Sequence, residues 1–199
     1  DHFKFVSKIE GLEFPEALRL LAKKAGVEVR GFDKEASSGK TKLYSVSELA
    51  AKFFEKQLWE SDNGKKALEY LRGRGLKNDT IREWRLGYAP NTWNALRSFL
   101  KNAGYGEGDI IKAGLAVQKD NGESYDRFRG RIMFPISDSS GRVIAFSGRI
   151  FEDDGKSAKY LNSPDTPIFS KFAVLYGLDK AKESIRKNNF SILVEGQMD

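Results

Sequence analysis

A segment in the second half of the chain combines basic and apolar side chains at strand spacing. Residues 125–136 read YDRFRGRIMFPI. Successive side chains of a β-strand point to opposite faces, so alternate residues share a face. The apolar ones are predicted to share one face: Phe128, Ile132, Phe134 and Ile136. The basic ones are predicted to share the other: Arg127, Arg129 and Arg131.

The next predicted strand adds to this basic face. It places Ile144 and Phe146 with the apolar set, and Ser147 and Arg149 away from it. If the apolar faces align, four arginines gather on the opposite face with no acidic residue alternating among them. Because like charges packed this closely repel, the row favours an anionic ligand. A solvated face, with carboxylates reaching in from elsewhere, explains the same pattern.

A second polar motif lies at residues 159–164 (KYLNSP), and Lys171 follows it. A lysine provides a point charge for phosphate, and Tyr160 and Asn162 can form hydrogen bonds. Taken alone, residues 162–164 are equally a turn with a helix cap, and the turn is the simpler interpretation.

An acidic residue follows an apolar run near the end of the sequence. Residues 190–194 (FSILV) are predicted to form a strand, with Glu195 and Gly196 directly after it. A carboxylate at the end of a buried parallel strand lies where open α/β sheets bind ligands, and glycine permits a sharp turn there. Glu195 could hold Mg²⁺ or act as a general base. Charged residues at strand ends are common, so this motif alone is weak.

Composition excludes several kinds of site. The 199 residues include one histidine, His2, and no cysteine, so disulfides, thiolate zinc sites and Ser/His/Asp or Cys/His catalysis lack their parts in this sequence. No GxxxxGK[ST] phosphate loop is present. A net charge of +6 and a pI near 9.3 are compatible with a polyanionic partner. No apolar run approaches the roughly 18–20 residues of a membrane span, so no membrane partner is expected.

Helices are expected over most of the first half. Apolar spacing predicts helices within 1–29, from Tyr44 to Glu60 with Ser45 or Ser47 as cap, and at Gly64–Arg72, Asn78–Trp84, Thr92–Ala103 and Gly108–Lys112. Residues 30–42 are polar and rich in Gly and Ser, which predicts a linker. The aromatic residues of this half are interpreted as core packing rather than a base-stacking surface: Tyr70, Trp84, Tyr88, Trp93 and Phe99.

After Gly114 the period changes to that of strands. Residues 127–150 are predicted to be strands with a turn at Asp138–Gly141, followed by a helix from Asp179 to about Asn189. The predicted fold class is therefore α+β: a helical N-terminal part, then a small mixed α/β subdomain with antiparallel strands, leading into a further α/β strand.

Taken in order, these motifs resemble the bacterial DnaG-type DNA primases. The resemblance covers nearly the whole chain and rests on YLRGRGL (70–76), LGYAP (86–90), YDRFR (125–129), FSGR (146–149), KYLNSP (159–164) and EGQMD (195–199). Residues 1–6 (DHFKFV) resemble the sequence just after that family's zinc ribbon, and residues 194–196 resemble the first motif of its Toprim domain. The resemblance implies three parts: residues 1–43 as the helical tail of the zinc-binding region plus linker, 44–188 as the N-terminal subdomain of the catalytic core, and 189–199 as the start of the Toprim domain.

The resemblance also implies roles for individual residues. Glu195, Lys159 and Lys171 are expected to be catalytic, with Glu195 holding Mg²⁺ (or Mn²⁺) and Asp199 as a further candidate ligand. The expected template- or nucleotide-binding residues are Arg74, Arg127, Arg129, Arg131, Arg149, Tyr160 and Asn162. One departure is Gln197, where the family usually has an aromatic residue.

The implied function is DNA-templated synthesis of short RNA primers by metal-dependent nucleotidyl transfer. The implied ligands are a single-stranded DNA template, NTPs and an RNA primer, with a replicative helicase and a single-strand binding protein as partners of other parts of the chain. Zn²⁺ is expected in an upstream ribbon, and further Toprim aspartates are expected downstream. This stretch alone is therefore expected to be inactive. The protein is expected to act in the bacterial cytoplasm, at the nucleoid or replisome. A non-catalytic single-strand-binding relative, and a Toprim nuclease or topoisomerase, are the alternatives. The latter leaves residues 159–164 unexplained.

Overall fold

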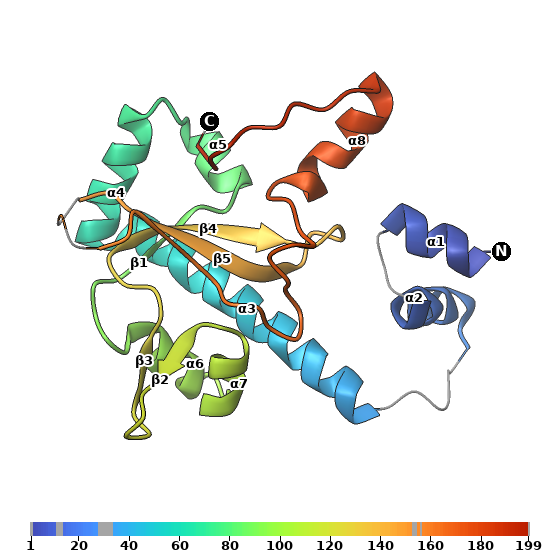
Figure 1. The fold of residues 1–199 in the computed structure, drawn as a ribbon, viewed down its shortest axis with the longest axis horizontal. Helices are drawn as coiled ribbons and strands as arrows, with labels where there is room; N and C mark the ends of the chain where they lie inside the picture. The colour runs from blue at the N-terminus through green and yellow to red at the C-terminus, as the bar shows by residue number, and fades with distance from the viewer. Residues whose placement is uncertain (1, 11–13, 28–33, 153–154, 156, 199) are drawn as a thin grey trace.

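The computed structural model describes residues 2–10, 14–27, 34–152, 155 and 157–198, and places a four-stranded sheet at the centre of the fold (Figure 1). The helices are α1 (His2–Glu10), α2 (Phe14–Ala25), α3 (Lys34–Glu60), α4 (Asp62–Gly73), α5 (Asn78–Glu83), α6 (Ala95–Asn102), α7 (Glu107–Lys112) and α8 (Leu178–Asn188). The strands are β1 (Gly87–Ala89), β2 (Ala116–Gln118), β3 (Ser124–Asp126), β4 (Arg131–Ser137), β5 (Val143–Ile150) and β6 (Tyr160–Asn162). The predicted α+β class is confirmed.

Helix α3 runs diagonally past the sheet and contacts β1, β4 and β5 (Figure 1). Its buried side chains recur at helical spacing and form one stripe: Leu43, Val46, Ala50, Phe54 and Leu58. The linker prediction was wrong for residues 34–42, which belong to this helix, whereas residues 30–33 lie outside the described residues. Individual Gly and Ser residues cost a helix at most about 1 kcal/mol each, which packing of the later turns offsets. Ser45 therefore lies inside the helix, where its hydroxyl donates to the carbonyl of Thr41 at 3.1 Å, and caps nothing.

The four short helices predicted after α3 correspond to α4–α7, with ends that differ by a few residues. Ser61 begins α4 by accepting the N–H of Gly64 at 3.0 Å. Among the described residues, no helix is both long and apolar enough to span a bilayer.

Close approach of β1 to α3 requires a glycine. A Cβ at Gly87 would lie 2.5 Å from the Cβ of Phe54, well inside van der Waals contact. Gly87 therefore permits the strand to cross the helix directly, and β1 then pairs with β4.

The central sheet has the order β1-β4-β5-β6 with antiparallel neighbours, and β2 and β3 form a separate hairpin. The predicted turn between β4 and β5 is confirmed: the N–H of Gly141 donates to the carbonyl of Asp138 at 2.9 Å. The Asp138 carboxylate also accepts the N–H groups of Ser140 and Arg142 at 2.9 and 3.0 Å.

The predicted face of four arginines does not form. Ile132 pairs with Arg149, and Phe134 pairs with Ser147, and directly paired residues share a face. Arg149 therefore lies on the face of Ile132, whereas Arg131 lies on the other. The prediction failed because both faces of β4 are buried, so apolar residues do not mark a single core face.

The apolar side chains accordingly divide between clusters. Phe128 and Phe146 pack with the cluster that includes Met133, whereas Ile132 and Phe134 pack with Leu58 and its neighbours. The prediction that Phe128 shares a face with Ile132 was wrong, because Phe128 precedes β4 and its ring turns to the other layer.

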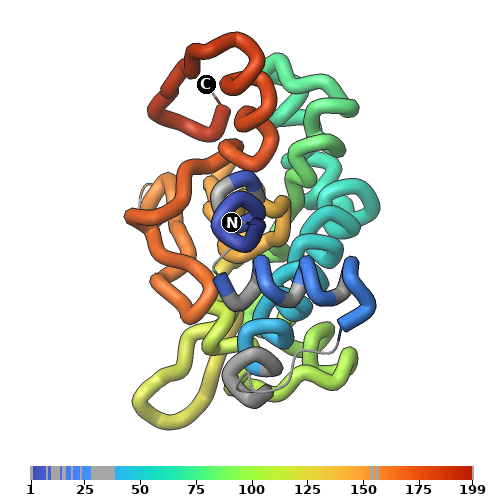
Figure 2. Tube along the Cα trace, turned by 90° about the vertical axis from the view of Figure 1, so that its right-hand side faces the viewer, coloured from blue at the N-terminus to red at the C-terminus, as the bar shows by residue number. Residues whose placement is uncertain are grey.

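The predicted helix near residue 179 is confirmed as α8, which Asn189 ends in the left-handed conformation (φ 58°). The predicted strand over 190–194 is absent: the run is irregular, and Ile192 and Leu193 are 81% and 82% exposed. A strand needs a partner for its backbone hydrogen bonds, and no described strand pairs with this run. The run leaves α8 and passes toward α5, where Met198 packs against the cluster of Leu71 and Ile81 (Figures 1 and 2).

Candidate nucleic-acid interface

An exposed cluster of aromatic and cationic side chains lies where α6 begins and β3 ends. The Trp93 side chain is 62% exposed, and the Arg129 guanidinium lies 4.2 Å from its ring centroid. The Tyr125 ring meets Trp93 edge-on at 5.4 Å between centroids, and Lys119 lies 5.8 Å from Tyr125. The core interpretation was therefore wrong for Trp93, although it is confirmed for the buried Tyr88.

Arg127 lies between Tyr125 and Arg129 in sequence and contacts strand β6. Its guanidinium donates to the backbone carbonyl of Asn162 from Nε at 3.2 Å and from Nη2 at 2.9 Å. Burial lowers the pKa of Arg127, although the group stays charged at neutral pH. Arg127 and Asn162 are 35 residues apart in sequence, so this contact brings the 125–129 and 159–164 motifs together in space.

The Arg131 guanidinium forms hydrogen bonds with backbone carbonyls on both sides of the β5–β6 connection. Nη1 donates to Gly148 at 3.0 Å and to Lys159 at 3.3 Å, and Nη2 donates to Ala158 at 2.9 Å. The residue is only 7% exposed. This geometry favours a role in holding the backbone before β6 rather than direct contact with a ligand.

Arg149 lies between two tyrosines. Its guanidinium donates to the Tyr70 hydroxyl and lies 4.9 Å from the Tyr70 ring centroid and 5.9 Å from that of Tyr160. The residue is nearly buried, at 9% exposed. The 70–76, 146–149 and 159–164 motifs therefore converge on Arg149.

Ser163 fixes the segment after β6. Its hydroxyl accepts the N–H of Phe146 at 3.0 Å, and its own N–H donates to the Phe146 carbonyl at 2.8 Å. Asn162 is the last residue of β6, and Ser163 and Pro164 continue as an irregular segment bonded to β5, so the predicted turn is absent; among the described residues no helix follows directly for Ser163 to cap. Asp165 then accepts the N–H of Lys171 at 2.8 Å.

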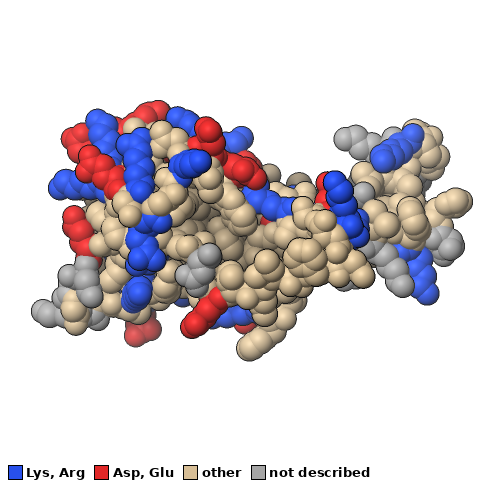
Figure 3. Space-filling model, turned by 90° about the horizontal axis from the view of Figure 1, so that it is seen from above, with Lys and Arg blue, Asp and Glu red and all other residues tan. Residues whose placement is uncertain are grey.

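The predicted lysines lie at the surface. Lys159 and Lys171 are exposed, as is Arg74 at the end of α4. Figure 3 shows a row of Lys and Arg side chains crossing the end of the molecule that carries α4, with most acidic side chains beside the row rather than within it.

Contacts of the described residues form three groups: Trp93 with Tyr125 and Arg129, Arg127 with Asn162, and Arg149 with Tyr70 and Tyr160. The groups are connected through the chain, because Arg127 lies between Tyr125 and Arg129 in sequence and strand β6 carries both Asn162 and Tyr160. We name these eight residues the basic–aromatic track. Exposed Lys159 adjoins it next to Tyr160.

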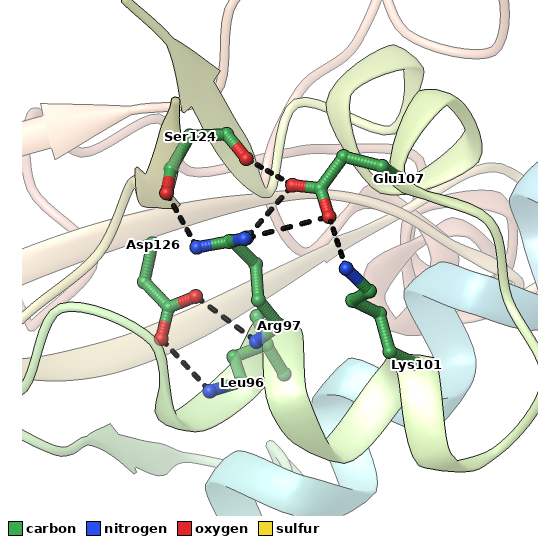
Figure 4. A network of polar contacts seen from close by, with 6 residues as sticks. All are labelled: Leu96, Arg97, Lys101, Glu107, Ser124 and Asp126. Carbon is green, nitrogen blue, oxygen red and sulfur yellow. Dashed lines mark hydrogen bonds and ion pairs between the residues drawn. The ribbon is translucent and has the colours of Figure 1, made fainter. Parts of the chain in front are cut away.

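Sequence analysis did not predict a polar network that joins α6, α7 and β3 next to Trp93 (Figure 4). The Asp126 carboxylate accepts the N–H groups of Leu96 and Arg97 at 2.8 and 3.0 Å. The Glu107 carboxylate lies 2.7 Å from Nε of Arg97 and 3.1 Å from Nζ of Lys101, and it accepts the Ser124 hydroxyl. No periodic signal connects partners that lie 10 to 30 residues apart.

Burial acts to raise the pKa of Glu107, but hydrogen bonds from Ser124, Arg97 and Lys101 outweigh it and lower the pKa to about 2. Asp126 shows the opposite balance, because its burial raises the pKa more than the backbone bonds from Arg97 and Leu96 lower it. The surroundings therefore favour the ionised form of Glu107, whereas burial disfavours the ionised form of Asp126.

The described residues do not form a metal site. Glu195 is exposed in an irregular segment, and no group of three described His, Cys, Asp or Glu side chains could hold an ion. Asp199, the second predicted ligand, lies outside the described residues. One carboxylate is too few for Mg²⁺, which prefers several oxygen ligands, so Glu195 alone does not fit a bound metal.

Comparison with known proteins identifies the family. Residues 53–182 match the family model described as the DNA primase catalytic core, N-terminal domain. A DNA primase of Deinococcus radiodurans is 42% identical over 200 residues, covering 100% of this chain and 34% of that protein. The chain thus spans about a third of the length of such curated relatives.

Two solved structures are also similar. The Aquifex aeolicus primase, with zinc-binding and RNA polymerase domains, is 36% identical with a TM-score of 0.74, covering 100% of this chain and 47% of that one. The RNA polymerase domain of Mycobacterium tuberculosis primase DnaG, in complex with a double-stranded DNA oligomer carrying a 6-nucleotide overhang, is 35% identical with a TM-score of 0.73, covering 78% and 48%. The family match spans the helices and strands that build the basic–aromatic track, and this chain belongs to the DnaG primase catalytic-core family.

Proposed function

We propose that this chain is the part of a DNA primase that binds the single-stranded DNA template and the incoming NTP during synthesis of RNA primers. The observation that carries the proposal is the exposed Trp93 ring with the Arg129 guanidinium against it, at one end of the basic–aromatic track. The M. tuberculosis relative in complex with DNA supports a nucleic-acid ligand.

The two kinds of side chain serve different parts of a nucleic acid. An exposed aromatic ring stacks on a base, and each such contact contributes about 1–3 kcal/mol with little regard to sequence. Guanidinium and ammonium groups bind backbone or triphosphate oxygens. The tolerance of stacking for any base suits a protein that must accept changing template sequence.

We assign individual residues in the same way. Arg74, Arg127, Arg129, Arg149, Tyr160 and Asn162 are proposed to border the template, and Arg131 to act by positioning Lys159. Exposed Lys159 and Lys171 are proposed to face the NTP phosphates, where ammonium groups neutralise charge during nucleotidyl transfer.

Metal chemistry requires more than the described residues provide. We infer that Glu195 contributes one carboxylate to a Mg²⁺ or Mn²⁺ site completed by other acidic residues, with Asp199 a candidate. By itself the chain is therefore expected not to synthesise primers, and template-dependent dinucleotide formation by the purified chain would contradict that expectation.

We extend the proposal to the whole protein as the resemblance implies. In the whole protein we expect a zinc ribbon. We further expect a replicative helicase and a single-strand binding protein as partners, and a location in the bacterial cytoplasm. A pull-down of the helicase with the full-length protein, compared with this chain, tests the partner directly.

Template binding is tested by fluorescence anisotropy of a labelled oligo(dT) titrated with the chain at several salt concentrations. If about four cationic groups contact phosphates, log K falls against log salt with a slope of roughly −3. Trp93→Ala is expected to weaken binding about tenfold without changing the slope, because a stacking contact releases no counterion.

The chain offers a matched control. Phe190 has the same exposed fraction as Trp93, 62%, and lies off the track, so Phe190→Ala should leave binding unchanged. A salt-independent affinity, or equal effects of the two substitutions, contradicts the proposed template site.

A further inference from the structure

Asp126 forms hydrogen bonds through every polar group that it has. Its backbone N–H donates to the Trp93 carbonyl at 2.8 Å, and its own carbonyl accepts from the Arg129 guanidinium. One carboxylate oxygen accepts the N–H of Leu96 at 2.8 Å, and the other accepts the N–H of Arg97 at 3.0 Å. The residue is 2% exposed, so it contacts no solvent-borne ligand itself.

The carboxylate of Asp126 replaces a local cap for α6. Asn94, which precedes the helix, makes no side-chain capping bond. The first N–H groups of the helix are instead satisfied from β3, and a negative charge at a helix N-terminus is favourable. Because Trp93 lies just before α6, the point where the helix starts fixes where this ring emerges.

The same residue sets the position of Arg129. The guanidinium that donates to the Asp126 carbonyl also lies against the Trp93 ring. Asp126 is thus bonded to both members of the stacked pair, through its N–H to Trp93 and through its carbonyl to Arg129.

A carboxylate is a costly choice at this place. Burial opposes the charge of Asp126, and only two backbone N–H groups and the cations Arg97 and Arg129 counteract it. A role confined to filling space would be met at lower cost by a neutral side chain. Two acceptor oxygens for two N–H donors, by contrast, are what a carboxylate provides and a carboxamide does not.

We propose that Asp126 is a positioning residue that holds Trp93 and Arg129 in the stacked arrangement which receives a template base, without touching the template. The inference rests on the proposed template site. It assigns to the acidic member of the 125–129 motif a structural duty toward two neighbours rather than a duty toward metal or substrate.

Asp126→Asn tests this at nearly constant volume. The amide retains one acceptor, and its NH₂ group must face a backbone N–H that donates. The helix start is then expected to shift and the Trp93 ring to reorient.

The chain contains three tryptophans, so 5-fluorotryptophan labelling gives three ¹⁹F resonances in the complete chain, and Trp93→Phe assigns the relevant one. In D126N the Trp93 resonance should move or broaden while those of Trp59 and Trp84 stay in place. Oligo(dT) affinity should fall about fivefold, at the lower end of what one stacked base contributes, with an unchanged salt slope.

Asp138→Asn is the control, because the Asp138 carboxylate also accepts two backbone N–H groups but lies in the β4–β5 turn. It should move neither the Trp93 resonance nor the DNA affinity. Should D126N fail to fold, Asp126→Ser, which also keeps a single capping oxygen, is measured with the same expectation.

An unmoved Trp93 resonance in the folded variant overturns the inference. A moved resonance with wild-type DNA affinity overturns its link to the template. If the unsubstituted chain binds no oligo(dT) while D126N still moves the resonance, the proposed template site fails but the positioning of Trp93 by Asp126 stands.

Discussion

Replacing Glu107 by glutamine removes the carboxylate that joins α6, α7 and the β2–β3 hairpin (Figure 4). The carboxylate has a pKa of about 2 in the folded chain, against 4.5 ordinarily. At about 1.4 kcal/mol for each tenfold change in proton affinity, this difference corresponds to roughly 3 kcal/mol at neutral pH. The side chain is 30% exposed, so solvent screening reduces the expected loss in E107Q to roughly 1–2 kcal/mol.

The pH dependence follows from the direction of the change. A carboxyl with a lower pKa in the folded than in the unfolded chain stabilises the fold above pH 4.5, and this contribution is lost as the pH falls toward 2. The difference in free energy of unfolding between the parent chain and E107Q should therefore be constant above about pH 6 and decline steadily as the pH falls from 4.5 to 3.

Urea denaturation at pH 7, 5, 4 and 3 measures this difference, and other carboxyls that titrate cancel between the two proteins. Glu123→Gln is the control, because Glu123 lies in the same hairpin but is exposed, 3.4 Å from Lys119. A pH-independent difference, or an equal loss in the control, would refute the assignment of the stabilisation to the Glu107 charge.

Two further predictions concern packing and buried hydrogen bonding. Gly87→Ala places a Cβ 2.5 Å from that of Phe54 and should lower the free energy of unfolding by at least about 2 kcal/mol, seen as a lower Tm, because α3 and β1 must separate. Gly73→Ala, with no atom within 4 Å of the added Cβ, should be neutral or slightly stabilising by the same measurement. Ser163→Ala leaves the buried N–H of Phe146 without its acceptor and should cost about 1–3 kcal/mol in urea denaturation.

Equal melting temperatures for the two glycine variants would show that α3 and β1 have room to adjust. A Ser163→Ala chain as stable as its parent would show that another acceptor, such as water, replaces the hydroxyl.

Local patterns predicted what depends on neighbours in sequence. The apolar stripe of α3 up to Glu60, the four short helices, the turn at Asp138 and the helix α8 each follow from spacing, glycine or capping side chains. Their positions in the structure match because helices and tight turns are closed by bonds between residues a few positions apart.

Properties that depend on distant partners were not predictable in this way. Whether Arg149 shares a face with Arg131 depends on the register of β4 and β5, and burial of both faces removed the contrast that alternation needs. The run at 190–194 has strand composition, but no described strand pairs with it. Trp93 has the residue type of a core side chain, and only its neighbours in the fold determine that it is exposed. The bonds of Asp126 to α6 likewise have no local signature.

The attachment of the segment before β6 has a consequence for protein engineering. Arg131 holds the carbonyls of Ala158 and Lys159, and the N–H of Ile150 donates to the Lys159 carbonyl at 3.1 Å. Both ends of the connection between β5 and β6 are thereby fixed to the sheet, and lengthening a surface loop costs only about 0.6 kcal/mol for each doubling. A peptide tag or fluorophore inserted into this connection should therefore leave Lys159 in place, which makes the connection a site for a reporter beside the basic–aromatic track.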